Sequence, residues 1–117
     1  MMDTSIITVK DKSLGVDMEG YLLDPLEWDL DVAHFIAEQE EIKLSDHHWM
    51  VVNFVRDFFD SRQTVPEARF ALKAMKESLG KENATRKYLY QLFPYGYGQQ
   101  ACKIAGMRMP KKLLLDL

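Results

Sequence analysis

The spacing of the apolar residues changes once along this chain of 117 residues, and that change defines the fold class. Residues 6–9 are apolar or β-branched, and residues 14–16 follow a polar turn, so the two stretches predict a short β-hairpin. After Pro25 the apolar residues recur about every 3.6 positions, which is typical of amphipathic helices. We therefore expect a mostly α (α+β) chain: an N-terminal β-hairpin followed by an orthogonal bundle of about five short helices.

The ends of the expected helices are indicated by capping and breaking residues. Ser45 is a good N-cap for the second helix, and Thr64 with Glu67 has the spacing of a capping box for the third. Gly80 is suited to end the third helix, and Pro94 stops the fourth. The expected helices span residues 29–40, 46–61, 65–79, 85–93 and 99–105.

Two features go beyond a plain helical bundle. The helices within residues 46–79 are joined by a short turn that contains a proline, an outline that resembles a helix-turn-helix. After Gly106 the sequence has no period, so we expect a flexible C-terminal arm. The chain is accordingly divided into a single domain, residues 1–106, and an arm, residues 107–117.

Charge is distributed unevenly along the chain. Residues 1–63 carry a formal charge of −9 and residues 64–117 carry +6, within a net charge of −3. Two interpretations stay open at this point. The basic half meets nucleic acid or an acidic protein partner, or the two halves attract each other within the fold.

Composition excludes several classes of protein. No apolar run approaches the roughly 20 residues of a membrane-spanning helix, and the N-terminus lacks the pattern of a signal peptide. We therefore expect a cytoplasmic protein without membrane insertion. A single cysteine rules out a disulfide within one copy, and the histidines lack the spacing of a metal site, so neither a metal nor another cofactor is expected.

Two other polar groups receive structural explanations. His47 and His48 are adjacent, so on a helix their side chains point in different directions. We expect one of them at a capping position and the other on the surface, and not a pair of metal ligands. The run of residues 38–41 is acidic, and we expect it to form a solvated face.

The only cysteine, Cys102, lies close to the basic C-terminal residues. A thiol reacts as its thiolate, which nearby cations favour, and Lys103 is adjacent while Arg108, Lys111 and Lys112 follow. These residues are the candidate reactive thiol and its candidate binding residues. The alternative is that Cys102 is a small apolar residue that fills a helix interface.

Several blocks of sequence stand in a familiar order. They include residues 17–22 (DMEGYL), 44–49 (LSDHHW), 86–94 (RKYLYQLFP) and 98–106 (GQQACKIAG). Together they resemble the DsrC/TusE (DsvC) family of sulfur-relay proteins, in the family's order, over residues 14–110. The resemblance implies a cytoplasmic sulfur carrier that serves dissimilatory sulfite reductase or a Tus/Dsr-type sulfurtransferase complex for tRNA thiolation. Such a carrier is at most a co-substrate and not a self-contained enzyme.

The resemblance also assigns the arm positions. Cys102 matches the inner cysteine of the family's arm, whereas Leu113 stands where the outer cysteine belongs. Two functions follow from that difference. One is a relay protein of altered thiol chemistry, in which Cys102 forms a persulfide or a mixed disulfide with a partner. The other is a regulatory paralogue that keeps the docking surface and binds DNA.

Overall fold

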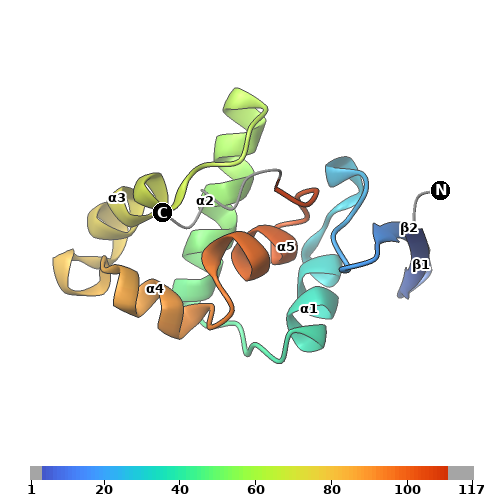
Figure 1. The fold of residues 1–117 in the computed structure, drawn as a ribbon, viewed down its shortest axis with the longest axis horizontal. Helices are drawn as coiled ribbons and strands as arrows, with labels where there is room; N and C mark the ends of the chain where they lie inside the picture. The colour runs from blue at the N-terminus through green and yellow to red at the C-terminus, as the bar shows by residue number, and fades with distance from the viewer. Residues whose placement is uncertain (1–3, 111–117) are drawn as a thin grey trace.

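The fold is a small β-hairpin followed by a bundle of short helices (Figure 1). The structure is a computed structural model, and it describes residues 4–110. In chain order the strands and α-helices are β1 (Thr4–Val9), β2 (Lys12–Asp17), α1 (Leu30–Gln39), α2 (Asp46–Arg62), α3 (Ala68–Leu79), α4 (Arg86–Leu92) and α5 (Cys102–Ile104). Short 3-10 turns span Pro25–Glu27 and Lys81–Asn83, and a π-helical turn spans Tyr97–Ala101. The expected fold class is confirmed.

The hairpin strands are longer than the apolar pattern predicts. Val9 pairs with Lys12, so Lys10 and Asp11 alone form the turn. Lys10 has a φ of 55°, and a two-residue hairpin turn needs such left-handed backbone. Backbone pairing therefore extends into the polar residues at the strand ends, which the apolar pattern of the sequence does not mark as strand.

The beginning of α2 confirms the expected cap at Ser45. Its hydroxyl accepts from the backbone N–H of His48 at 3.4 Å, and Nδ1 of His48 accepts from the backbone N–H of Ser45 at 3.0 Å. The other ring nitrogen, Nε2, donates to the carbonyl of Leu92 at 2.8 Å. His48 thus takes the capping role expected for one of the adjacent histidines, while His47 is half-buried and hydrogen-bonded to the hydroxyl of Tyr88.

This arrangement predicts a loss of stability in mild acid. Burial lowers the pKa of the His48 imidazole below its ordinary 6.5, although its hydrogen bond to Leu92 acts in the opposite direction. Protonation would also place a hydrogen on Nδ1, which now accepts from Ser45. The folded chain binds this proton less readily than the unfolded chain. The contribution of neutral His48 to the free energy of unfolding is therefore complete above pH 6.5, and it is lost as the pH falls through the lowered pKa.

The measurement is urea unfolding between pH 8 and pH 5. His48→Gln keeps a side chain that can close a capping box but cannot titrate in this range, so the variant is expected to lose less stability on acidification than the wild type. Equal pH dependence in the two proteins would contradict the assignment to His48.

The turn between α2 and α3 differs from the expected capping box. Gln63 ends α2 in the left-handed region, and the N-cap of α3 is Glu67, without a side-chain hydrogen bond. The spacing of Thr64 and Glu67 is therefore not used as a cap, because the helix begins only at Ala68. The short turn still leaves α2 and α3 in the helix-turn-helix outline that the sequence predicts.

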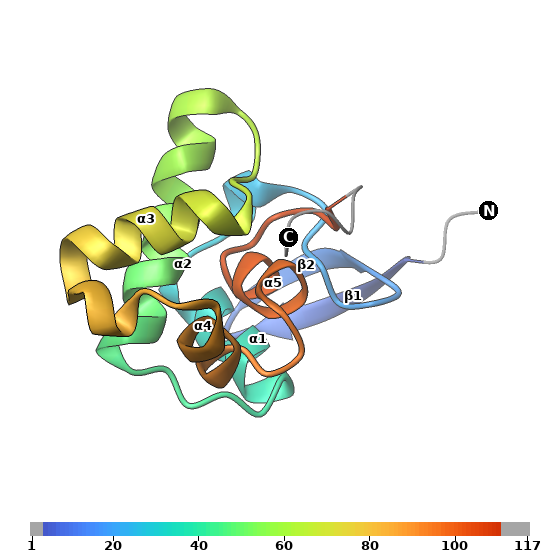
Figure 2. The ribbon, with the colours of Figure 1, turned by 60° about the vertical axis from the view of Figure 1, so that its left-hand side comes forward.

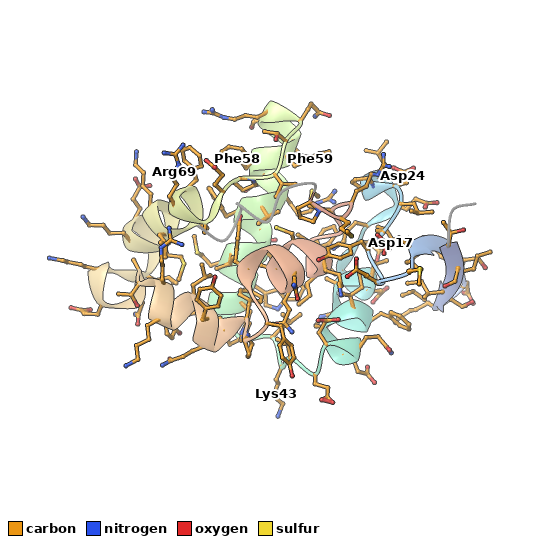
Figure 3. The ribbon with its side chains drawn as sticks, in the orientation of Figure 1. Asp17, Asp24, Lys43, Phe58, Phe59 and Arg69 are labelled. Atoms are coloured by element: carbon orange, nitrogen blue, oxygen red, sulfur yellow. The ribbon has the colours of Figure 1, made fainter. Side chains whose placement is uncertain are left out.

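A cluster of rings and guanidinium groups lies between α2 and α3. The rings of Phe58 and Phe70 are 5.8 Å apart, and Arg62 and Arg69 lie over them at 5.1 and 4.8 Å. Figure 3 shows Phe58 and Arg69 at one edge of the molecule, on the side of α3. These arginines therefore cover aromatic surface, and Arg69 also pairs with Glu67.

The two oppositely charged halves are joined by an ion pair. Lys103 Nζ lies 3.1 Å from Glu40 Oε2, and these two side chains are 12% and 21% exposed. Other pairs stay within one half of the chain, among them Lys10–Asp31, Lys12–Asp29 and Arg69–Glu67. Attraction between the halves thus has a specific partly buried component, next to Cys102.

The core lies where α1, α2 and the C-terminal segment meet. α5 packs against α1 and α2, and it lies near the middle of the molecule in both views (Figures 1 and 2). Fully buried side chains from these elements include Val32, Ala33, Val51, Val52, Val55, Ile104 and Ala105. The segment that carries the thiol is therefore part of the core.

Candidate functional site around Cys102

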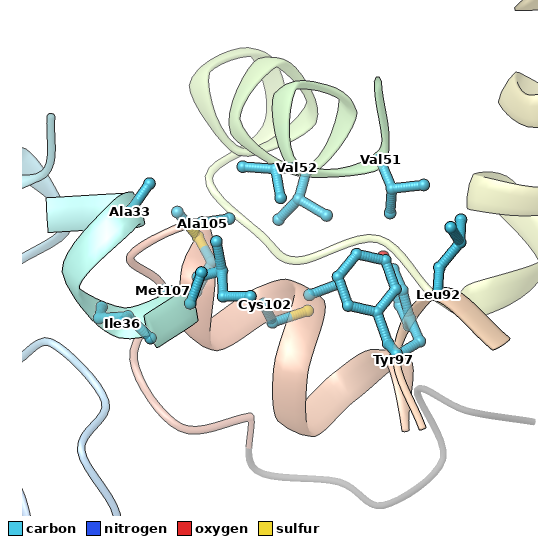
Figure 4. Packing of buried hydrophobic residues seen from close by; sticks show 14 of the residues in the cluster. Ala33, Ile36, Val51, Val52, Leu92, Tyr97, Cys102, Ala105 and Met107 are labelled. Atoms are coloured by element: carbon cyan, nitrogen blue, oxygen red, sulfur yellow. The ribbon is translucent and has the colours of Figure 1, made fainter. Parts of the chain in front are cut away.

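Cys102 is enclosed by the core. It is the first residue of α5, and none of its surface is exposed. Figure 4 shows its sulfur among buried side chains, near Tyr97 and below Val52 of α2. This position agrees with the alternative of a small residue that fills a helix interface, and an external reagent reaches the thiol only after local opening.

The π-helical turn before Cys102 is held by its two ends. Gly96 has a φ of 110° and starts the turn, and the N–H of Cys102 donates to the carbonyl of Tyr97. The fully buried Tyr97 donates from its phenol to the carbonyl of Pro66 at 2.6 Å. The sequence predicts a fifth helix over residues 99–105, and the structure instead begins it as a π-turn anchored to the α2–α3 connection.

The C-terminal end of α5 is held by a tryptophan and an arginine. Trp28 Nε1 donates to the carbonyl of Ile104 at 2.7 Å, and Arg56 Nη1 donates to the carbonyls of Ala105 and Pro25 at 3.1 and 3.0 Å. The guanidinium also lies 4.5 Å from the centre of the Trp28 ring. Burial lowers the pKa of Arg56, yet arginine stays protonated in proteins, so two carbonyls receive charge-assisted bonds.

A polar group covers the other side of the segment. Gln100 and Lys103, which flank Cys102, both bind the carboxylate of Glu40. Tyr21 lies beneath the ammonium of Lys103 and donates to the carbonyl of Gln99 at 3.3 Å. Burial raises the pKa of the Tyr21 phenol, and the nearby Cys102 adds to this increase, so the phenol remains a hydrogen-bond donor.

The structure places only part of the candidate binding residues near Cys102. Lys103 is the one that the structure places beside Cys102, where it is engaged by Glu40. Met107 is fully buried and its N–H donates to the carbonyl of Cys102, whereas Arg108 is exposed. Lys111, Lys112 and Leu113 lie outside the described residues.

The described residues around Cys102 form neither a metal site nor a membrane-spanning helix. Within residues 4–110 no three histidine, cysteine or acidic side chains gather as metal ligands. In the same part of the chain, no helix combines the length and the apolar character needed to span a bilayer. An open hollow of about 490 Å³ lies beside the end of α1, lined by residues that include His34, Glu38 and Leu44, and it does not include Cys102.

Three residues of this site were not singled out as functional by the sequence. Trp28 and Arg56 lie within residues 14–110, over which the family resemblance extends, but nothing in the residues alone joins them to Cys102. Glu40 was expected on a solvated acidic face, and that expectation is wrong for this residue because its carboxylate faces α5 and is largely covered. Within the acidic run of residues 38–41, the sequence does not indicate which carboxylate points inward.

The family is identified by comparison with known proteins. A model of the family described as "DsrC like protein" matches residues 8–114. The chain belongs to the DsrC-like family. Among curated relatives of this DsrC-like chain, sulfurtransferase TusE of Escherichia coli strain K12 is 46% identical over 103 residues, covering 88% of this chain and 94% of the relative. The sulfurtransferase TusE homolog of Haemophilus influenzae is 41% identical over 109 residues, covering 93% and 100%.

Solved structures agree with the fold of the DsrC-like chain. The solution structure of Allochromatium vinosum DsrC superposes with a TM-score of 0.82 at 42% identity, covering 96% of this chain and 98% of that one. The crystal structure of the oxidized γ-subunit of dissimilatory sulfite reductase (DsrC) from Archaeoglobus fulgidus gives 0.86 at 33% identity, covering 92% and 98%. The comparisons do not favour the alternative of a DNA-binding regulatory paralogue.

Proposed function

We propose that this DsrC-like chain is a sulfur-relay protein that carries sulfur on Cys102. The observation that carries the proposal is that the only thiol of a chain related to sulfurtransferase TusE and DsrC lies at the start of α5. Leu113, at the position of the outer arm cysteine, has no group that can form a persulfide. A disulfide or trisulfide within one copy is therefore impossible, and sulfur is carried by one thiol.

The proposed transfer balances without an added oxidant. The thiolate of Cys102 attacks the outer sulfur of a persulfide on a donor protein. A sulfur–sulfur bond forms at Cys102 while the donor's sulfur–sulfur bond breaks, and the donor leaves as a thiolate. In the reverse sense, the Cys102 persulfide passes its outer sulfur to an acceptor thiolate. The chain acts as a co-substrate of its partners.

The partners that fit this role are other members of a sulfur relay in the cytoplasm. The names of the relatives suggest a sulfurtransferase complex or a dissimilatory sulfite reductase as the specific partner. Pull-down with the wild-type chain and with Cys102→Ser tests this point. A partner that binds through the thiol is lost from the variant, whereas a partner retained by both is recognised by the surface.

Intact-mass measurement after incubation with a persulfide donor tests the relay itself. The wild type is expected to gain the mass of one sulfur atom, and Cys102→Ser is expected to gain none. A two-cysteine family member serves as the positive control for the donor. A parallel sample in denaturant shows that Cys102 is chemically competent once it is exposed. If the native chain stays unloaded while both controls load, sulfur transfer through Cys102 is rejected.

A further inference from the structure

The two residues that flank Cys102 share one carboxylate. Oε1 of Glu40 accepts from the side-chain amide of Gln100 at 3.1 Å, and Oε2 accepts from the ammonium of Lys103 at 3.1 Å. Gln100 is two positions before the thiol and Lys103 is one position after it. Glu40 is the C-cap residue of α1, so its side chain connects the end of that helix to both sides of Cys102.

These contacts are shielded from water. The side chains of Lys103 and Glu40 are 12% and 21% exposed, and Gln100 is only 1% exposed. By contrast, the surface pair Lys10–Asp31 is 72% and 50% exposed. A shielded charge-assisted pair is screened less by salt and holds its partners more firmly than a surface pair does.

The amide of Gln100 is fixed at both of its ends. Its oxygen accepts from the backbone N–H of Tyr95 at 2.9 Å while its nitrogen donates to Glu40. Lys103 is similarly held from a second direction, since its ammonium lies 4.8 Å from the centre of the Tyr21 ring. The carboxylate therefore completes a network, and a change at Glu40 removes the acceptor of two oriented donors together.

We propose that Glu40 is a positioning residue that controls access to Cys102, by holding the segment on both sides of the thiol against α1. Release of Gln100 and Lys103 from its carboxylate is the local opening that lets a sulfur donor reach the thiol. The biological meaning of this step rests on the proposed function, but the control of access is a property of the fold and is measured without any sulfur donor.

The test is the rate at which iodoacetamide alkylates Cys102 in the native chain. Glu40→Gln keeps the size of the side chain but removes its charge and leaves two donors competing for one carbonyl oxygen. We expect alkylation to become faster on the order of tenfold, because the closed state loses a charge-assisted contact and local opening is more populated. Glu38→Gln, an exposed position one half-turn away on α1, is the matched control and is expected to react at the wild-type rate.

Urea unfolding of the same variants separates local opening from general destabilisation. If Glu40 controls access, the substitution Glu40→Gln raises the alkylation rate by a larger factor than it raises the globally unfolded fraction. The alkylation rate also depends only weakly on urea at low concentrations. A wild-type rate in Glu40→Gln, or an increase equal to the change in the unfolded fraction, overturns the proposal. Failure of Cys102 to accept sulfur would reject the relay but would leave this alkylation result unaffected.

Discussion

Replacing Gly106 with alanine is expected to destabilise the fold by about 3 kcal/mol, from backbone strain together with overpacking. Gly106 has a φ of 77°, and an added Cβ would lie 2.3 Å from Cδ1 of Trp28 and 2.7 Å from its Cγ. The ring has little freedom to retreat, because its Nε1 donates to Ile104 and the guanidinium of Arg56 lies over it. Urea or thermal unfolding measures the loss.

Gly20 provides a matched control for the backbone contribution. Its φ of 90° is also in the region that favours glycine, but an added Cβ would meet nothing within 4 Å. Gly20→Ala is therefore expected to cost only the strain, about 1 kcal/mol. If the two variants were destabilised equally, the close packing of Trp28 against Gly106 would not be important for stability.

Truncating Tyr97 to alanine is expected to cost about 4 kcal/mol, since a fully buried aromatic ring is removed and a cavity remains. The phenol also donates to the carbonyl of Pro66 at 2.6 Å. Tyr97→Phe keeps the ring but leaves that carbonyl without this donor, so it is expected to cost about 1 kcal/mol. The difference between the variants separates packing from hydrogen bonding.

The neighbouring Tyr95 is the control for Tyr97. Its side chain is 75% exposed, so Tyr95→Ala is expected to change the unfolding free energy by less than about 0.5 kcal/mol. A small effect of Tyr97→Ala, close to that of Tyr95→Ala, would show that the π-helical turn is not held by its first residue.

The arrangement of helices follows from local signals in the sequence. Ser45 and Gly80 mark helix ends correctly because their effects depend on hydrogen bonds and backbone freedom within a few residues. The spacing of Thr64 and Glu67 has the same local form but is not used, because the chain ends α2 with Gln63 in the left-handed region and delays α3 until Ala68. A capping motif predicts a helix start only where the preceding turn permits it.

The candidate site could be predicted only in part. Cys102 is identifiable because it is the only thiol, and the resemblance places it in a sulfur-relay arm. Its enclosure depends on contacts with residues more than forty positions away, such as Arg56 and Glu40. Long-range contacts of this kind leave no periodic signal in the sequence, and in an acidic run the inward-facing carboxylate looks like its solvated neighbours.

The position of Trp28 has a practical consequence. The chain has two tryptophans, and the other, Trp49, lies edge-on to His34 at 5.2 Å between ring centres. In a Trp49→Phe background the fluorescence of Trp28 reports a single environment, made of the Ile104 carbonyl and the Arg56 guanidinium. Separation of α5 from this ring exchanges the Ile104 carbonyl for water, whereas Arg56 belongs to α2 and does not move with α5. The protein thus contains its own optical reporter for the motion that uncovers its thiol.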